Sequence, residues 1–183
     1  MKGVCSKWGS VVPEMPGRLP HVADLEGSRE CRHCRRAASA AAARGLVSQK
    51  NIPLALAQTI ANAALAQCQS MGFKVSVVVV DRDGLPIAMI RGDGAGLHTP
   101  EGADRKAYTT RTFRQPSAAF AKRLVERPDT VGSLQYSRVL ALAGGLPIKS
   151  GDEVVGAVGV SGSPGKDDIC SQAGIDKVAD QLK

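Results

Sequence analysis

His98 is the side chain of this sequence that could do the widest range of chemistry. It is the one histidine after residue 50, and it directly precedes Thr99 and Pro100, which favour the cap and first turn of a helix. A side chain in that place projects over the helix start into the loop before it. A neutral imidazole there could ligate a metal ion or a haem iron. A surface or hydrogen-bonded histidine is the alternative, because one histidine makes no constellation.

Basic residues follow His98 on a helix expected over residues 99–113. Arg105 and Lys106 could pair with the carboxylates of an anionic ligand, such as the propionates of a haem. Tyr108 could add an apolar wall or a second ligand, although such a residue more often belongs to the core. A solvated basic face is the alternative interpretation.

Three glycine-rich segments are expected to meet near these side chains: residues 91–99, residues 161–165 and the segment before Gly144. Glycine allows a backbone to approach a ligand or another subunit closely, although tight turns alone would also explain it. A phosphate-binding P-loop is excluded, because Val160 stands where that motif needs glycine and Asp167 stands where it needs a hydroxyl.

The sequence shows no conventional catalytic constellation. Ser161 does not lie in a Gly-x-Ser-x-Gly elbow. Asp93 or Glu101 could serve as a base, but neither has a paired carboxylate in the pattern. Whether the protein is an enzyme therefore stays open.

The five cysteines form an odd and irregularly spaced set, which is not typical of a secreted disulfide framework. Cys68 falls on the apolar stripe of an expected helix, where a small hydrophobic role is favoured. Cys31 and Cys34 form a CxxC motif, but Arg35 replaces the histidine that covalent haem attachment requires. A zinc site there would need two further ligands, for which the nearby candidates are Cys5, His21 and His33.

The net charge of +7 is concentrated near the N-terminus, where residues 1–50 hold nine Lys/Arg against four Asp/Glu. The remainder is nearly neutral and poor in aromatic residues, which argues against nucleic-acid binding. No apolar run is long enough to span a membrane. Residues 1–45 lack a sustained period and are predicted to be a disordered or peripheral extension. The sequence leaves the compartment unknown: we expect a cytoplasmic protein from the sequence as written, and a periplasmic or exported one if the Arg- and Ala-rich stretch at 29–43 is a mis-started or degraded signal.

Residues 46–183 are predicted to form one domain. The apolar spacing predicts a helix over 53–71, and the β-branched run at 75–80 predicts a strand covered on both faces. A hairpin to 85–91 follows, then helices over 99–113 and 118–125, a short strand within 134–142, a hairpin of 144–149 with 153–161, and a helix over 166–182. This order predicts an α+β fold, a profilin-like layered sandwich with an antiparallel sheet of about five strands flanked by helices.

Four motifs resemble the GlcG/HbpS-like haem-binding family (DUF336-type), which also includes the C-terminal domain of PduO proteins. They are residues 91–99, 105–109, 144–148 and 156–162, in that order. The resemblance implies the same α+β fold, a homo-oligomer, and haem binding as found in a number of members, with haem degradation or redox sensing proposed for some. Members of this kind often carry an export signal before the first helix.

The resemblance and the residues together give a functional hypothesis: a small protein that binds haem or another tetrapyrrole. His98 is the candidate axial ligand of the haem iron, and the other candidate cofactor-binding residues are Arg105, Lys106, Tyr108 and Thr109. The alternatives are an accessory protein or enzyme that acts on a small anionic metabolite, and a purely structural oligomer subunit.

Overall fold

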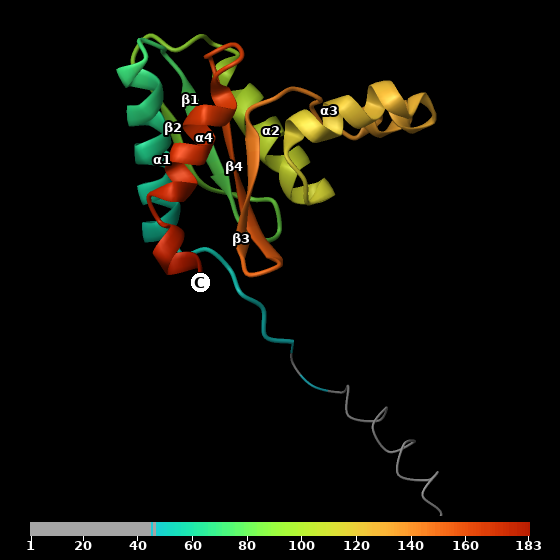
Figure 1. Ribbon diagram of the computed structural model, residues 1–183, viewed down its shortest axis with the longest axis horizontal. Coiled ribbons are helices and arrows are strands. Elements are labelled where there is room, and N and C mark those ends of the chain that lie inside the picture. Colours follow the sequence, from blue (N-terminus) through green and yellow to red (C-terminus); the bar gives the residue numbers. More distant parts are fainter. Residues whose placement is uncertain (1–44, 46) are drawn as a thin grey trace, which may run out of the picture. The chain divides into compact units, whose positions relative to one another are not determined.

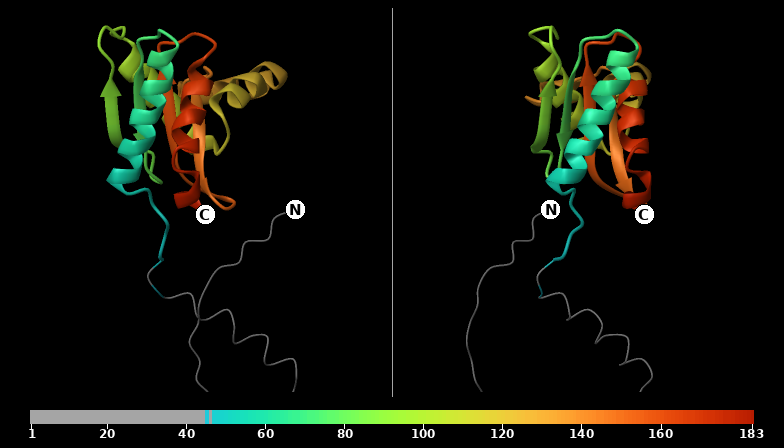
Figure 2. Two further views of the ribbon diagram at one scale, coloured as in Figure 1. Left: turned by 60° about the vertical axis from the view of Figure 1, so that its left-hand side comes forward. Right: turned by 90° about the vertical axis from the view of Figure 1, so that its left-hand side faces the viewer.

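A central antiparallel sheet organises the domain. The computed structural model describes residue 45 and residues 47–183, of which Ser48–Lys183 form one compact unit. The strand order is β2-β1-β4-β3, with bounds Ser76–Val80 (β1), Pro86–Arg91 (β2), Gly145–Ser150 (β3) and Glu153–Ser161 (β4). Helices α1 (Leu54–Ser70) and α4 (Asp167–Asp176) lie on one face, and α2 (Thr99–Phe113) lies on the other (Figures 1 and 2). The predicted α+β layered fold is confirmed.

The valine run in β1 separates two apolar cores. Val77 and Val79 pack into the larger core, beneath α1 and α4, while Val78 and Val80 pack with alanines of α2 and β4. All five residues of β1 are buried, as predicted for a strand covered on both faces. The strand thereby fixes the two helical layers relative to each other.

Helix α2 lies unusually close to the sheet where it crosses β4. A side chain at Gly159 would place its Cβ 2.2 Å from the Ala103 carbonyl oxygen and 2.7 Å from the Ala107 nitrogen. Only glycine fits in such a gap. The close packing brings the next residues of α2 against the C-terminal end of β4.

The expected strand within residues 134–142 does not form, so the sheet has four strands. Helix α3 (Ser117–Glu126) and the 3-10 helix η2 (Pro128–Gln135) instead extend away from the sheet (Figure 1). Side chains of α2 hold the segment that follows. The Leu140 N–H donates to Thr109 Oγ1 at 2.8 Å, and Arg138 forms two hydrogen bonds to Asp104 at 2.7 and 3.2 Å. The backbone N–H of Leu140 therefore has a hydrogen-bond partner without a neighbouring strand.

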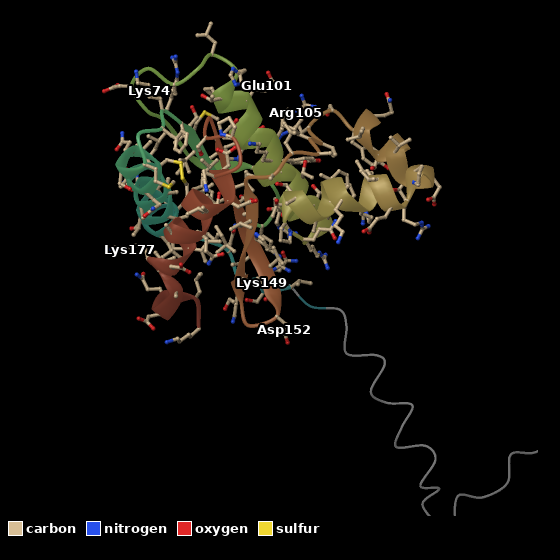
Figure 3. The ribbon with its side chains drawn as sticks, turned by 45° about the horizontal axis from the view of Figure 1, so that its top comes forward. Lys74, Glu101, Arg105, Lys149, Asp152 and Lys177 are labelled. Atoms are coloured by element: carbon tan, nitrogen blue, oxygen red, sulfur yellow. A yellow bond between two sulfur atoms is a disulfide. The ribbon has the colours of Figure 1, made fainter. Side chains whose placement is uncertain are left out.

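The structure also corrects two other expectations. The final helix is shorter than predicted: α4 ends at Asp176, and a short 3-10 helix η3 (Ala179–Leu182) follows. Cys68 is buried as expected but is not a lone hydrophobic residue, because it forms a disulfide with Cys170 of α4, with a Cα–Cα distance of 5.5 Å. Figure 3 shows this bond between the two helices. The two cysteines are 102 residues apart, so no local spacing signalled the pair.

Two other predictions concern membrane spans and the N-terminal extension. Among the described residues, no helix is both long and apolar enough to cross a membrane. The extension over 1–45 and the CxxC motif of Cys31 and Cys34 lie outside the described residues apart from residue 45, and our interpretation of them stays a prediction.

Candidate functional site

A hollow of about 530 Å³ lies at the end of the sheet where α2 begins. Its walls come from the loop before α2, from α2 itself, from the segment before β3, and from the turn between β4 and α4. The residues that line it are Lys74, Gly96, His98, Thr99, Lys106, Leu142, Ala143, Ser161, Gly162, Pro164, Gly165 and Asp167. The three glycine-rich segments of the sequence therefore do meet at one place.

Other hollows of similar volume, about 480, 590 and 610 Å³, lie beside the start of α1 and along β3 and α4. None of these three is lined by a histidine or by a buried charged side chain. The chemistry of the lining therefore favours the hollow at His98 as the candidate site.

His98 stands at the mouth of the hollow as the N-cap residue of α2. Its imidazole folds back over Gly96: a Cβ added to that glycine would lie 3.0 Å from His98 Cε1 and 3.2 Å from Nδ1. The expected cap, Thr99, is instead the first helical residue, and its hydroxyl donates to the Gly96 carbonyl at 2.7 Å. His98 itself is exposed, so its imidazole is available to a ligand.

Lys106 forms the floor of the hollow through a buried ion pair. Its ammonium donates to Asp167 Oδ2 at 2.8 Å and to the Val160 carbonyl at 3.0 Å. The two side chains of the pair are only 5% and 9% exposed. An ammonium carries three N–H groups, so these contacts use two of them, and the third has no hydrogen-bond partner among the described residues.

Asp167 is held rigidly because Ser163 binds its other oxygen. The Ser163 backbone N–H and hydroxyl both donate to Asp167 Oδ1, at 2.9 and 2.7 Å. Buried charges are costly unless they are paired and fully hydrogen-bonded. This carboxylate meets both conditions, and its position in turn fixes the ammonium of Lys106.

Gly144 closes the site from the side of β3. Its φ is +120°, and a Cβ there would lie 2.6 Å from Asp167 Cβ, 2.6 Å from the Val160 oxygen and 3.1 Å from Lys106 Nζ. Its N–H donates to Asp168 Oδ1 at 2.7 Å, and its carbonyl accepts from the Val160 N–H at 2.9 Å. The glycine is required both for its conformation and for the close approach.

The remaining predicted site residues lie on α2 but outside the lining of the hollow. Arg105 donates to the Val139 carbonyl at 2.9 Å and pairs with Glu101 at 3.3 Å; Figure 3 shows both residues of this pair on the helix. Tyr108 lies beneath the Arg138 guanidinium, 4.2 Å from the ring centre. The Thr109 hydroxyl donates to the Arg105 carbonyl at 2.8 Å.

The structure thus brings together His98 and Lys106 of the five predicted residues. It adds Lys74, Asp167 and the apolar Leu142, which sequence reasoning did not single out. Lys74 lies across the hollow from α2, beside the loop that contains Gly94 (Figure 3), where a Cβ would be 3.1 Å from its ammonium. No local motif marks these three residues, because each joins the site only through the tertiary fold.

A bare metal ion has no cage in the part of the chain that the structure describes. No three His, Cys, Asp or Glu side chains come together there in a group that could hold one. Among the described residues, His98 would therefore be a metal ion's one ligand in this hollow. Such a site suits an iron that a macrocycle already holds.

The fold places the chain in a class of small α+β domains built on a four-stranded antiparallel sheet, with the hollow as its candidate site. Residues 52–176 match the family model described as "Haem degrading protein HbpS-like", and the chain belongs to this family. The resemblance inferred from the four motifs is thereby confirmed.

Comparisons with individual proteins agree with this family. An uncharacterized 15.0 kDa protein of Citrobacter freundii, from the dhaT-dhaS intergenic region, is 33% identical over 114 residues, which cover 61% of this chain and 80% of that protein. A double mutant of Streptomyces reticuli HbpS is similar in structure, with 37% identity, a TM-score of 0.68, and coverage of 74% of this chain and 93% of that one.

Two further structures share the fold. Klebsiella pneumoniae ORFY is 27% identical with a TM-score of 0.68, and the match covers 74% of this chain and 98% of that one. A PduOC:heme complex is 22% identical with a TM-score of 0.63, covering 69% and 94% of the two chains. At this lower identity the likeness concerns the fold alone.

Proposed function

We propose that this protein binds haem, or a closely related tetrapyrrole, in the hollow at the start of α2. The observation that carries the proposal is an exposed imidazole, His98, at the mouth of a hollow whose floor is the buried ammonium of Lys106. An imidazole and a cationic hydrogen-bond donor are the two groups that a haem with its propionates requires.

The rest of the lining is compatible with such a ligand. Leu142, Ala143 and Pro164 offer an apolar wall to a macrocycle, and Leu142 is 54% exposed. Lys74 offers a second cation at the rim. A bound haem would supply a redox-active iron; His98 would ligate that iron, Lys106 and Lys74 would pair with the propionates, and Leu142 would contact the ring.

The comparisons support the haem hypothesis at the level of the family. The description of the matching family names haem degradation, and a protein of the same fold has been crystallised with haem. We infer a role in haem handling, of which haem degradation and redox sensing are the two specific forms. We also propose that the protein assembles as a homo-oligomer.

A haem titration of the full chain tests the proposal. His98→Ala is expected to shift the Soret band and to weaken binding, whereas Lys149→Gln, on an exposed lysine of β3, is expected to leave both unchanged. Because His21 and His33 could bind haem on their own, the titration should be repeated with both replaced by alanine. An unchanged Soret band and affinity in His98→Ala would remove this histidine from the ligand role.

The second candidate function is the binding of a small anionic metabolite. It is favoured by the free N–H of Lys106 together with Lys74 in the same hollow, because both recognise a carboxylate without needing a macrocycle. Competition distinguishes the two: a carboxylate metabolite that binds here should displace haem from the wild type and not depend on His98. Incubation of the haem-loaded protein with a reductant, followed by detection of a ring-opened product, tests for degradation.

A further inference from the structure

The disulfide lies in direct contact with the turn that lines the hollow. Cys68 Sγ is 3.2 Å from Ser163 Oγ, and both cysteines are fully buried. A disulfide sulfur has no hydrogen to donate, and the single hydrogen of the Ser163 hydroxyl goes to Asp167 Oδ1 at 2.7 Å. In the oxidised protein the contact between Cys68 and Ser163 is therefore one of packing.

Only three contacts separate the sulfur of Cys68 from the floor of the hollow. Ser163 touches the sulfur and holds Asp167 through its hydroxyl and its N–H. Asp167 in turn holds the ammonium of Lys106 at 2.8 Å. These polar groups are all buried, and a buried hydrogen-bonded network responds as a unit when one member moves.

Reduction of the disulfide would act on Ser163 in two ways. The two sulfur atoms lose their covalent bond and move apart, and because both cysteines are fully buried in a close-packed interior, neighbouring side chains move with them. The new thiol also becomes a hydrogen-bond donor that faces the Ser163 oxygen. Both changes act on the residue that positions the carboxylate of Asp167.

We propose that oxidation of Cys68 and Cys170 is a maturation step that sets the ligand affinity of the hollow. The two thiols lose two electrons and two protons to a disulfide oxidant, which leaves as two thiols, and the new bond fixes Ser163 and through it Asp167 and Lys106. Because both sulfurs are fully buried once α1 and α4 have packed, an oxidant reaches the thiols only before this packing is complete, so the redox state is set while the protein folds. The ligand-affinity part of this inference rests on the proposed tetrapyrrole site.

The first test compares oxidised and reduced forms of the full chain. Cys5, Cys31 and Cys34 are replaced by serine so that only the buried pair can respond, and the chain is refolded with either glutathione disulfide or dithiothreitol. Alkylation and mass spectrometry count the thiols. Haem titration should show binding weaker by about 2- to 30-fold in the reduced form, the range of couplings carried through packed side chains. Equal affinities in two forms of verified thiol count would overturn the inference while leaving the proposed function intact.

A matched variant tests the route through Ser163. Ser163→Ala removes the hydroxyl that touches the sulfur and binds Asp167, so the affinities of its two redox forms should agree within about twofold. Ile148→Val, a core change in β3, controls for lost stability and should keep the wild-type ratio. If Ser163→Ala keeps the full ratio, the coupling does not run through this residue.

Amide hydrogen exchange gives a readout that needs no ligand. The Ser163 N–H, which donates to Asp167 Oδ1, should exchange faster in the reduced form, while the amide of Val78 in the central sheet should change little. If the chain binds no haem in either form, the proposed function fails, and the exchange experiment still decides whether the disulfide controls Ser163. Equal protection of the Ser163 amide in both forms would refute that control.

Discussion

The buried pair of Lys106 and Asp167 gives the sharpest test of how this site is held together. Asp167→Asn keeps the size of the side chain but removes its charge, and leaves the ammonium of Lys106 buried without a counterion. Breaking a buried ion pair from one side costs about 3–5 kcal/mol of unfolding free energy. This is a large share of the roughly 5–15 kcal/mol that stabilises an ordinary domain.

Urea unfolding followed by circular dichroism measures this loss. With an m-value of about 2 kcal/mol per molar urea, the midpoint should fall by about 1.5–2.5 M. Lys122→Met provides the exposed control, since the pair of Lys122 with Glu126 has side chains that are 76% and 60% exposed. That change should alter stability by no more than about 0.5 kcal/mol.

A double-mutant cycle then separates the ion pair from other effects of the substitution. In a Lys106→Met background no ammonium needs neutralising, so Asp167→Asn should cost at least about 2 kcal/mol less than in the wild type. The reasoning is refuted if Asp167→Asn costs the same in both backgrounds, or if its cost equals that of the exposed control.

Four other changes, one of them a matched control, have outcomes that follow from the geometry. Gly144→Ala should lower the unfolding free energy by more than about 2 kcal/mol in urea, because its Cβ would lie 2.6 Å from a neighbouring Cβ at a φ of +120°. Gly165→Ala, at a φ of +73° with nothing within 4 Å, should cost only about 1 kcal/mol; equal costs would contradict the close-approach argument. Replacing Cys68 and Cys170 together by alanine should cost about 2–5 kcal/mol in thermal or urea unfolding, and a cost near zero would show that the cross-link adds nothing. Gly96→Ala should push the adjacent imidazole aside and shift the Soret band of the haem-loaded protein without lowering stability by more than about 1 kcal/mol; an unchanged spectrum would count against this histidine as a ligand.

The sequence was informative about the fold wherever the signal was local. The β-branched run at 75–80 predicted a strand that forms a hairpin with residues 85–91, and both strands of this hairpin are present. The prediction of a strand within 134–142 was wrong, because the backbone of this segment does not pair with an edge strand of the sheet. The hydroxyl of Thr109, from another element, takes the backbone N–H of Leu140 instead, and nothing in the local pattern signals such a partner.

The candidate site was predictable only in part, for a related reason. His98 could be singled out because it precedes a helix start, which is a local feature. The carboxylate that holds Lys106 comes from Asp167, which lies 61 residues further along the chain. Its local sequence identifies Asp167 only as an acidic residue in the first turn of a helix. Long-range pairs of this kind leave no periodic trace in one sequence.

The position of β4 in the sheet has a consequence for the synthesis of this protein. This strand is the last one in the chain, yet it lies between β1 and β3 and is the sole link between them. A ribosome that has released residues 1–150 has therefore delivered one hairpin and one isolated strand, with no continuous sheet. Asp167 emerges later still, so the ion pair at the floor of the hollow forms only after β4 and the start of α4 have emerged. A chain that stops before α4 therefore keeps His98 and Lys106 but lacks the carboxylate that holds the ammonium of Lys106.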